Sequence, residues 1–391
     1  MDFKLPGEDD PRRRPIREWC EANPEPTGME LARSGYMAPF WPEPYGLAAD
    51  PELQYLIEDE LARANIRRPI QAMIAVHNCG LMLLHRGSDE YREKHLWKAL
   101  AGEEMWCQGY SEPDAGSDLG GARTRAELDG DVYIVNGSKI WTSGAHFAEF
   151  AFTVVRTNPS APKHKGLSML MIDLHAPGVE VQPIYNMTGG FPEFCQVFFN
   201  DVQVPVAARV GDEGEGWLLA VNQLAGERVL LAAPADVGPS ARNLADALIK
   251  RGSLDRDAAL RQRVAAHYIE GEALRLLRYR DLTDRLHGRK KGPEGSVMKL
   301  LGGPHHQRTA AIAMETMGLA GLVHNSEPFA EERPAERWGE RMWIAPAQTL
   351  MVGTTEIQKS IIAERLLNMP SEPDPDALLP WNEVKRTKAE T

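Results

Sequence analysis

The chain has 391 residues, of which 43% are hydrophobic and 26% charged. This composition is typical of a soluble globular protein with two or three structural units. The formal net charge of −12 argues against nucleic acid or an anionic membrane as the main partner. The four cysteines are far apart and form no CxxC pair, so they indicate neither a metal site nor a disulfide framework. With no signal peptide in the sequence, reduced thiols predict a cytoplasmic protein.

Residues 1–105 have a helical pattern and form the first predicted domain. Apolar residues at three- and four-residue spacing predict a helix over 52–64, and the pattern continues over 69–84 and 90–101. The segment 40–46 contains two prolines and predicts a loop between helices. Near the start, the run Arg12-Arg13-Arg14 beside Glu8-Asp9-Asp10 predicts a solvated terminal segment.

Residues 106–207 change to a period of two, which predicts strands over 131–137, 150–155, 167–172, 179–181 and 196–199. Short turns rich in Gly and Pro separate these strands, so we expect a compact β-barrel or sandwich as the middle domain.

From residue 208 to 391 the pattern is again helical. Apolar helices are predicted over 216–233, 260–286, 296–317 and 348–367, as in a four-helix bundle. The segment after Pro370 is rich in proline and charge and is predicted to fray. The expected fold is therefore mainly α with an inserted β-domain.

The most informative segment is Gln108-Gly-Tyr-Ser-Glu-Pro-Asp-Ala-Gly-Ser-Asp118. Its Pro, its two Gly and its short polar side chains predict a rigid, hydrogen-bonded loop. Serine hydroxyls and backbone N–H groups in such a loop can hold polar atoms of a ligand in a cleft. An ordinary surface turn is the alternative interpretation.

Four segments in order resemble the acyl-CoA dehydrogenase family over roughly residues 41–367. They are Gly109 to Asp118, Asn136-Gly-Ser-Lys-Ile-Trp-Thr-Ser143, Val197 to Pro205, and Val352-Gly-Thr-Thr-Glu-Ile-Gln-Lys359. The resemblance implies a helical domain, a small β-domain and a helical bundle, with FAD as cofactor and an acyl-CoA thioester as substrate. It is greatest for bacterial relatives that act on bulky acyl-CoAs such as steroid side chains.

The resemblance also implies roles for individual residues. Flavin contacts would fall on Gln108, Tyr110, Ser111, Trp141, Thr142, Ser143, Thr354, Thr355 and Glu356. The acyl-CoA would contact Ser117, Arg228 and Gly353, because glycine lets the backbone approach the thioester closely. The implied reaction is α,β-desaturation, in which a carboxylate removes the α-proton and flavin N5 accepts the β-hydride.

The position of the base departs from the common pattern. Many family members carry the catalytic Glu before the Gly-Thr of the last motif, where this chain has Val352. Some relatives place the base on another helix before an Arg, which corresponds here to Glu227 before Arg228. The apolar neighbours of Glu227 favour a neutral carboxyl group and so raise its basicity. Glu356 is a weaker rival, and a structural Glu-Arg pair is the alternative interpretation of Glu227.

Other departures keep alternative functions open. The Arg-x-x-Phe-Gly segment that reaches a neighbouring subunit's flavin is missing around 245–263, and the Gln-x-x-Gly-Gly run reads Glu315-Thr-Met-Gly-Leu319. The chain could therefore be a half-site or structural subunit of a heterotetramer rather than a homotetramer. A flavin oxidase or monooxygenase on the same fold is a third possibility. For a dehydrogenase, electron-transfer flavoprotein is the expected electron acceptor.

Overall fold

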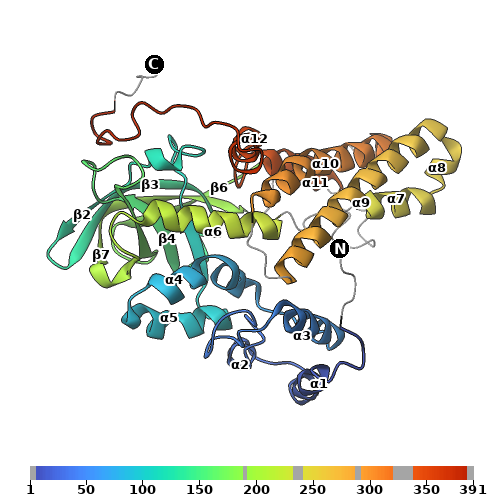
Figure 1. Ribbon diagram of the computed structural model, residues 1–391, viewed down its shortest axis with the longest axis horizontal. Helices are drawn as coiled ribbons and strands as arrows, with labels where there is room; N and C mark the ends of the chain where they lie inside the picture. The colour runs from blue at the N-terminus through green and yellow to red at the C-terminus, as the bar shows by residue number, and fades with distance from the viewer. Residues whose placement is uncertain (1–5, 188–191, 232–240, 287–291, 320–337, 385–391) are drawn as a thin grey trace. The chain divides into compact units, whose positions relative to one another are not determined.

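The computed structural model describes residues 6–187, 192–231, 241–286, 292–319 and 338–384. The chain divides into two compact units, and each is described by itself. One unit holds the N-terminal helices, the sheet, residues up to Gly226 and the C-terminal tail from Glu372. The other holds mainly residues 227–371 and is helical. Figure 1 shows the elements of both. Within the described residues, no helix is both long enough and apolar enough to cross a membrane.

The N-terminal region is helical, as predicted. Its α-helices are α1 (Arg13–Ala22), α2 (Gly28–Arg33), α3 (Pro51–Arg63), α4 (Gly80–Arg86) and α5 (Asp89–Ala101). Asp50 caps α3 by accepting the backbone N–H of Leu53, and Ser88 caps α5 in the same way. The helix predicted over 52–64 buries Leu56, Ile57 and Leu61, so its apolar periodicity gave the correct face.

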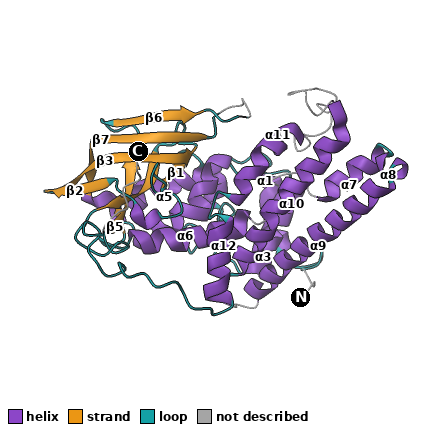
Figure 2. Ribbon diagram, turned by 90° about the horizontal axis from the view of Figure 1, so that it is seen from above, coloured by secondary structure: helices purple, strands orange, loops and turns teal. Residues whose placement is uncertain are grey.

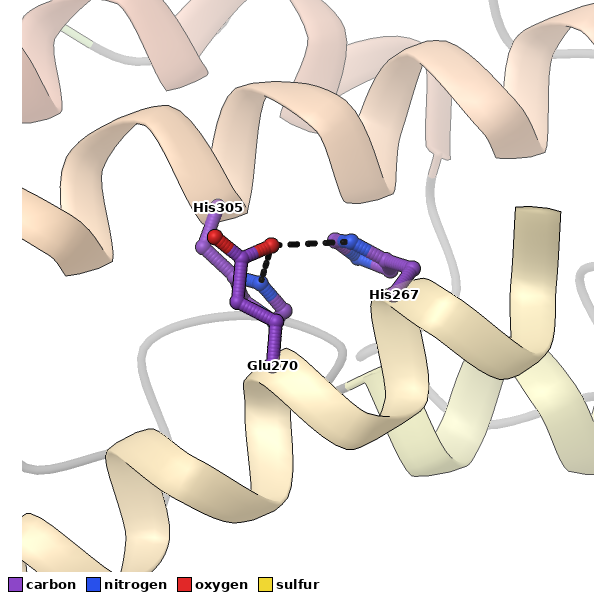
Figure 3. A group of neighbouring side chains, drawn as sticks. All are labelled: His267, Glu270 and His305. Atoms are coloured by element: carbon purple, nitrogen blue, oxygen red, sulfur yellow. Dashed lines mark hydrogen bonds and ion pairs between the residues drawn. The ribbon is translucent and has the colours of Figure 1, made fainter.

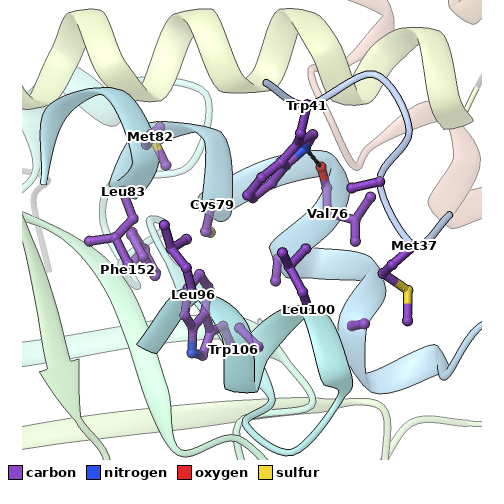
Figure 4. Close-up of a cluster of buried hydrophobic side chains, with 14 of the residues drawn as sticks. Met37, Trp41, Val76, Cys79, Met82, Leu83, Leu96, Leu100, Trp106 and Phe152 are labelled. Atoms are coloured by element: carbon purple, nitrogen blue, oxygen red, sulfur yellow. Dashed lines mark hydrogen bonds between the residues drawn. The ribbon is translucent and has the colours of Figure 1, made fainter. Parts of the chain in front are cut away.

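The segment predicted as one helix over 69–84 is broken. It consists of a 3₁₀ turn η1 (Ile70–Ala72), a π-helical turn η2 (Ala75–Cys79) and α4. A π-turn disturbs the regular backbone hydrogen bonds, and the indole N–H of Trp41 donates to the Val76 carbonyl at 3.1 Å. Figure 4 shows this bond within the apolar core. Gly80 has no room for a side chain, since a Cβ there would lie 2.5 Å from the Trp41 ring.

The prediction of a solvated N-terminal basic run is wrong for Arg13. Its side chain is 2% exposed, and its Nη1 lies 2.5 Å from both Asp59 and Glu60. Arg17 adds a bond from Nε to Glu60 Oε2 at 2.8 Å. A buried charge needs a partner, and here the partners come from α3, more than 40 positions away. Local composition alone could not reveal them.

The middle region forms one eight-stranded sheet (Figure 2). The strand path is β6-β7-β3-β2-β4-β5-β8, with β1 paired to β4. This strand path is open. The predicted barrel is therefore wrong, because the sheet does not close on itself. The strands are β1 (Trp106–Gly109), β2 (Arg125–Asp129), β3 (Val132–Ser143), β4 (Phe150–Arg156), β5 (Leu167–Asp173), β6 (Val179–Ile184), β7 (Phe194–Pro205) and β8 (Arg209–Val210).

Strands β4 and β5 are buried on both faces, which explains their nearly continuous apolar sequences. Alternate residues enter two different cores. Phe152 and Met169 join the core of the N-terminal helices, whereas Val155 and Leu170 join the opposite face of the sheet. Figure 4 shows Phe152 beside Leu83 and Leu96 of α4 and α5. The sheet edge at β1, where the first motif begins, is therefore fixed by packing on both sides.

The C-terminal unit is helical, as predicted. Its helices are α7 (Ala241–Lys250), α8 (Ser253–Arg256), α9 (Ala258–Leu286), α10 (Glu294–Met317), α11 (Trp338–Ile344) and α12 (Thr355–Ile361). Helix α6 (Gly216–Leu231) precedes them, and the boundary between the units falls within it. Helix α10 packs against α7, α9, α11 and α12, and a core that includes Leu248, Val264 and Ile312 joins α7, α9 and α10.

The helix predicted over 348–367 is wrong at its start. Residues up to Thr349 belong to a 3₁₀ segment η8 (Ala345–Thr349), and α12 begins after a turn at 350–353. A π-helical turn η9 (Ile362–Leu366) follows. The turn forms because Val352 and Gly353 both have positive φ angles, 55° and 91°, which a helix cannot contain. Apolar periodicity gives no sign of such a backbone change.

The C-terminal tail, predicted to fray, is held at residues 380–382. The backbone N–H groups of Trp381 and Asn382 donate to the carbonyls of Ala161 and Pro159 at 2.9 and 3.1 Å. The Trp381 ring also stacks on the Arg156 guanidinium, 4.2 Å from its centroid. These bonds hold the tail against the loop between β4 and β5, so residues 380–382 are ordered by tertiary contacts.

Candidate active site

The first motif forms a tight loop after β1. Glu112 and Ala115 exchange two backbone hydrogen bonds, at 2.9 and 3.0 Å, so Pro113 and Asp114 form the tip of a turn. Proline restricts φ in such a turn and stiffens it. The rigid, hydrogen-bonded loop predicted from composition is therefore present. Beyond the turn, Ser117 is exposed.

A buried ion pair joins the first motif to the second. Lys139 on β3 is fully buried, and its Nζ lies 2.8 Å from Glu112 Oε1 and 3.1 Å from the Tyr110 carbonyl. Glu112 also accepts backbone N–H groups from Arg123 and Thr124 at 2.6 and 2.8 Å. Burial alone would raise the pKa of Glu112, but Lys139 and these N–H groups outweigh it and hold the pKa below its usual value.

A break in strand pairing directs Trp141 outward. The β3–β7 register shifts between Lys139 and Thr142, and the Ile140 N–H donates instead to the Ser111 carbonyl at 2.9 Å. Trp141 itself has a φ of 60°, which is rare for a bulky residue and stores strain. Its ring is 57% exposed and meets Phe194 edge-on, with the ring centroids 5.9 Å apart. Bulges of this kind commonly re-aim a side chain beside an active site.

The polar groups around this bulge suit a bound cofactor. The structure brings Gln108, Tyr110 and Ser111 next to Trp141, Thr142 and Ser143, because β1 and β3 are in contact and Ser111 bonds to Ile140. Among the described residues, Gln108 Nε2 and the buried Thr142 Oγ1 have no hydrogen-bond partner. Buried polar atoms nearly always have one, so a ligand with acceptors and donors fits here. Together with the exposed indole, these residues fit a flavin.

The last motif lies in the helical unit. Val352 has a φ of 55°, an unfavourable angle for a β-branched residue. The buried Gln358 donates its Nε2 to the carbonyls of Val352 and Gly353 at 3.1 and 3.4 Å, which holds the turn. Thr354 is the N-cap of α12 and accepts the Ile357 N–H at 3.4 Å. Thr355 follows in the first turn of the helix.

Glu356 is exposed in that first helical turn. Its own backbone N–H and the Thr354 side chain lower its pKa, so it is ionised at neutral pH and is a weak proton acceptor. This low basicity agrees with the prediction that Glu356 is a weaker candidate for the base than Glu227. The role of Glu356 stays a prediction, like those of the other site residues.

The preferred base, Glu227, lies on helix α6 together with Arg228. Glu227 and Arg228 lie on the helical backbone of α6, but their side chains lie outside the described residues. Gln223, one turn earlier, is 7% exposed. The assignment of Glu227 as base and of Arg228 as a substrate contact therefore remains a prediction from sequence.

Sequence reasoning missed three supporting residues. Glu112 and Lys139 lie within the motifs but were given no role, because a Lys beside Ile140 in a period-two strand has the ordinary pattern of a solvent-facing side chain. Arg156, 3% exposed, donates to the carbonyls of Gly120 and Ala122 at 2.6 and 3.1 Å. It thereby fixes the backbone just after the first motif. No sequence signal marked it.

Comparison with known proteins identifies the family. Three family models match in order: acyl-CoA dehydrogenase N-terminal domain over residues 9–103, middle domain over 107–202 and C-terminal domain over 214–367. The chain is 34% identical over 357 residues to acyl-CoA dehydrogenase IpdE1 of Mycolicibacterium smegmatis, covering 88% of each chain. It is 35% identical over 344 residues to acyl-CoA dehydrogenase FadE34 of Mycobacterium tuberculosis, covering 88% of this chain and 46% of that longer protein.

Solved structures agree with this result. The Tcur3481-Tcur3483 steroid ACAD structure matches with a TM-score of 0.77 at 28% identity, over 95% of this chain and 100% of that one. The ChsE4-ChsE5 complex from Mycobacterium tuberculosis matches with a TM-score of 0.76 at 28% identity, with the same coverage. The chain belongs to the acyl-CoA dehydrogenase family, whose members are oxidoreductases acting on CH–CH bonds.

Proposed function

We propose that this protein is an FAD-dependent acyl-CoA dehydrogenase that introduces an α,β double bond into an acyl-CoA thioester, with Glu227 as the base. The observation that carries the proposal is the site at the β3 bulge. Gln108 Nε2 on β1 and Thr142 Oγ1 on β3 lack a hydrogen-bond partner among the described residues, the two strands are in contact, and Trp141, strained and exposed, precedes Thr142. When bound, FAD would supply the hydride acceptor for the β-hydrogen.

The chain's own residues bind the cofactor, remove the α-proton and stabilise the developing charge. Gln108 and Thr142 hydrogen-bond the cofactor, and the Trp141 ring covers one side of it. The α-C–H bond breaks with its proton transferred to the Glu227 carboxylate. Backbone N–H groups hydrogen-bonded to the thioester carbonyl stabilise the negative charge that develops on its oxygen. The valine at 352 leaves the usual position of the base without a proton acceptor, which supports the assignment to Glu227.

The test is anaerobic flavin reduction by an acyl-CoA in the Glu227→Gln variant. Loss of the general base should slow reduction at least ~10²-fold while acyl-CoA binding is retained. Glu364→Gln is the matched control, because Glu364 is exposed in the same helical unit and has no assigned role, and it should keep most of the rate. The double change Glu227→Gln with Val352→Glu asks whether a carboxylate at the usual position restores activity. Near-normal reduction by Glu227→Gln would refute the assignment.

The substrate class that we infer is a bulky acyl-CoA such as a steroid side-chain thioester. The support is the similarity to a structure described as a steroid ACAD. A panel of short, long, branched, aromatic and steroid CoA esters tests this inference. Higher kcat/KM for short linear esters than for steroid esters would contradict it, without bearing on Glu227. Reduction of electron-transfer flavoprotein, measured against oxygen consumption, separates a dehydrogenase from an oxidase.

A second candidate is a subunit of a heterotetramer, and the similarity to the ChsE4-ChsE5 complex favours it. Large apolar side chains on the surface of the helical unit also suit subunit contacts, among them Ile249 at 62%, Ile269 at 68% and Leu350 at 65% exposure. Purification of the chain alone separates the candidates. A flavin-loaded homotetramer supports a self-sufficient enzyme, whereas a colourless protein that gains flavin only with a second subunit supports the heteromer.

A further inference from the structure

Three side chains with metal-ligating atoms converge within the helical unit, and no role was expected for them. His267 and Glu270 are one turn apart on α9, and His305 lies on α10 (Figure 3). Glu270 Oε2 lies 3.2 Å from His305 Nδ1 and 3.8 Å from His267 Nδ1. One ligand atom from each residue falls within 4.8 Å of the other two. Both imidazoles are buried, and they stack with centroids 4.0 Å apart.

The Thr309 hydroxyl oxygen lies 2.9 Å from the His305 carbonyl and 2.7 Å from His267 Nε2. When the hydroxyl donates its single proton to that carbonyl, His267 Nε2 is the donor to the hydroxyl oxygen. His267 Nδ1 therefore carries a lone pair, and it faces the Glu270 carboxylate oxygen. Two acceptors that face each other cannot bond to one another, but a cation between them would satisfy both.

A neutral imidazole is the form that binds metals. His305 can present Nδ1 to a cation when its proton is on Nε2. The trio then offers two imidazole nitrogens and one carboxylate.

The spacing of these atoms suits a small divalent ion. Ligands at ~2.1 Å from a tetrahedral zinc ion are ~3.4 Å apart, and the two separations from Glu270, 3.2 and 3.8 Å, lie on either side of that value. We propose that His267, Glu270 and His305 form a binding site for a divalent transition-metal ion of the zinc class. Such a set of two His and one carboxylate leaves a fourth position for water.

Neighbouring groups would orient the ligands. Thr309 holds the His267 ring through Nε2, as outer partners of metal-bound imidazoles do. Arg308 Nη2 bonds to Glu270 Oε1 at 2.5 Å, which fixes the carboxylate and leaves Oε2 for the ion. The positive charge of Arg308 opposes cation binding. Because the ligands come from α9 and α10, a bound ion would link the two longest helices of the unit.

Calorimetric titration with Zn²⁺ tests the site in the full-length protein, as purified and after chelator treatment and desalting. We expect saturation at one ion per chain. Glu270→Gln and His305→Gln should each weaken binding at least ~10²-fold, since even loss of an outer partner costs 10- to 100-fold. His306→Gln is the matched control: it changes the adjacent imidazole, whose ring lies 6.2 Å from that of His305, and should leave binding unchanged.

Two further measurements complete the test. Co²⁺ in the same site should give visible absorption that Glu270→Gln abolishes. Glu270 is 38% exposed in its side chain, so its isosteric variant is expected to fold, which circular dichroism verifies. The proposal fails if Zn²⁺ shows no saturable binding, or if binding persists unchanged in both ligand variants. None of these readouts depends on the dehydrogenase reaction.

Discussion

The ammonium group of Lys139, fully buried on β3, lies 2.8 Å from the carboxylate of Glu112 in the loop that follows β1. This contact is one of several that join the two motifs whose residues line the proposed flavin site. Glu112 is also held by the backbone N–H groups of Arg123 and Thr124. The carboxylate therefore fixes three chain segments at once, and its charge depends on Lys139 for compensation.

Replacing Lys139 with Met should leave the Glu112 charge buried and uncompensated. Removal of one partner from a buried ion pair costs about 3–5 kcal/mol. Urea unfolding should show this loss, and the flavin content of the purified variant should fall, because the Tyr110 carbonyl also loses its donor. The double change Lys139→Met with Glu112→Gln removes the charge and should recover part of the stability. Equal destabilisation in the single and double variants would contradict this account.

Val352 should be a source of strain rather than of stability. Its φ of 55° costs on the order of 1–3 kcal/mol for a β-branched residue, whereas glycine adopts that angle freely. Val352→Gly should therefore raise the free energy of unfolding by about 1 kcal/mol after the added chain entropy of glycine is subtracted. Denaturant unfolding measures the change.

The control for this prediction is Val132→Gly at the start of β3, because Val132 is not among the residues with a positive φ. That change should destabilise the protein, because glycine weakens a strand. A loss of stability in Val352→Gly as large as in the control would show that the turn holds no strain at this residue.

The sequence predicted those parts of the fold in which neighbouring residues decide the structure. Period two located β3 to β7 but missed β1, β2 and β8, and apolar spacing gave the buried face of α3. The prediction failed where residues that are distant in the sequence decide the structure. The sequence predicted a solvated Arg13, but Glu60 of α3 compensates its charge in the folded protein. The sequence also predicted a frayed tail at Trp381, but the Trp381 ring stacks on Arg156.

The same distinction between local and distant determinants applies to the candidate site. Motif residues such as Gln108 and Thr142 could be found from their pattern, and the structure shows that both have unpartnered polar atoms among the described residues. The outward direction of Trp141 could not be found, because it depends on a register shift between β3 and β7. The turn at Val352 was equally hidden, since valine disfavours the backbone angle that it adopts.

The contact between Trp381 and Arg156 should hold the C-terminal tail on the sheet unit. A stacked cation–aromatic contact contributes about 0.5–2 kcal/mol, so Trp381→Ala should release the tail while the rest of the unit stays folded. Limited proteolysis should then cleave the tail several times faster. Leu378→Ala is the control in the same tail, because Leu378 is 87% exposed. Unchanged cleavage in Trp381→Ala would mean that the backbone bonds at 381 and 382 suffice.

His77 should make the protein less stable in mild acid. Burial, with a smaller contribution from Arg68, lowers its pKa to about 4, from an ordinary value of 6.5. Between these values the unfolded chain binds a proton that the folded chain does not, so stability falls as the pH drops from 6.5 toward 4. From pH 7 to pH 5 this amounts to about 2 kcal/mol, at roughly 1.4 kcal/mol per pH unit.

Urea unfolding of the wild type and of His77→Gln at both pH values isolates this contribution, because other groups titrate alike in the two proteins. The wild type should lose about 2 kcal/mol more than the variant between pH 7 and pH 5. His175→Gln, a change at an exposed histidine, should behave as the wild type does. If His77→Gln loses as much stability as the wild type, the imidazole of His77 already titrates normally in the folded protein.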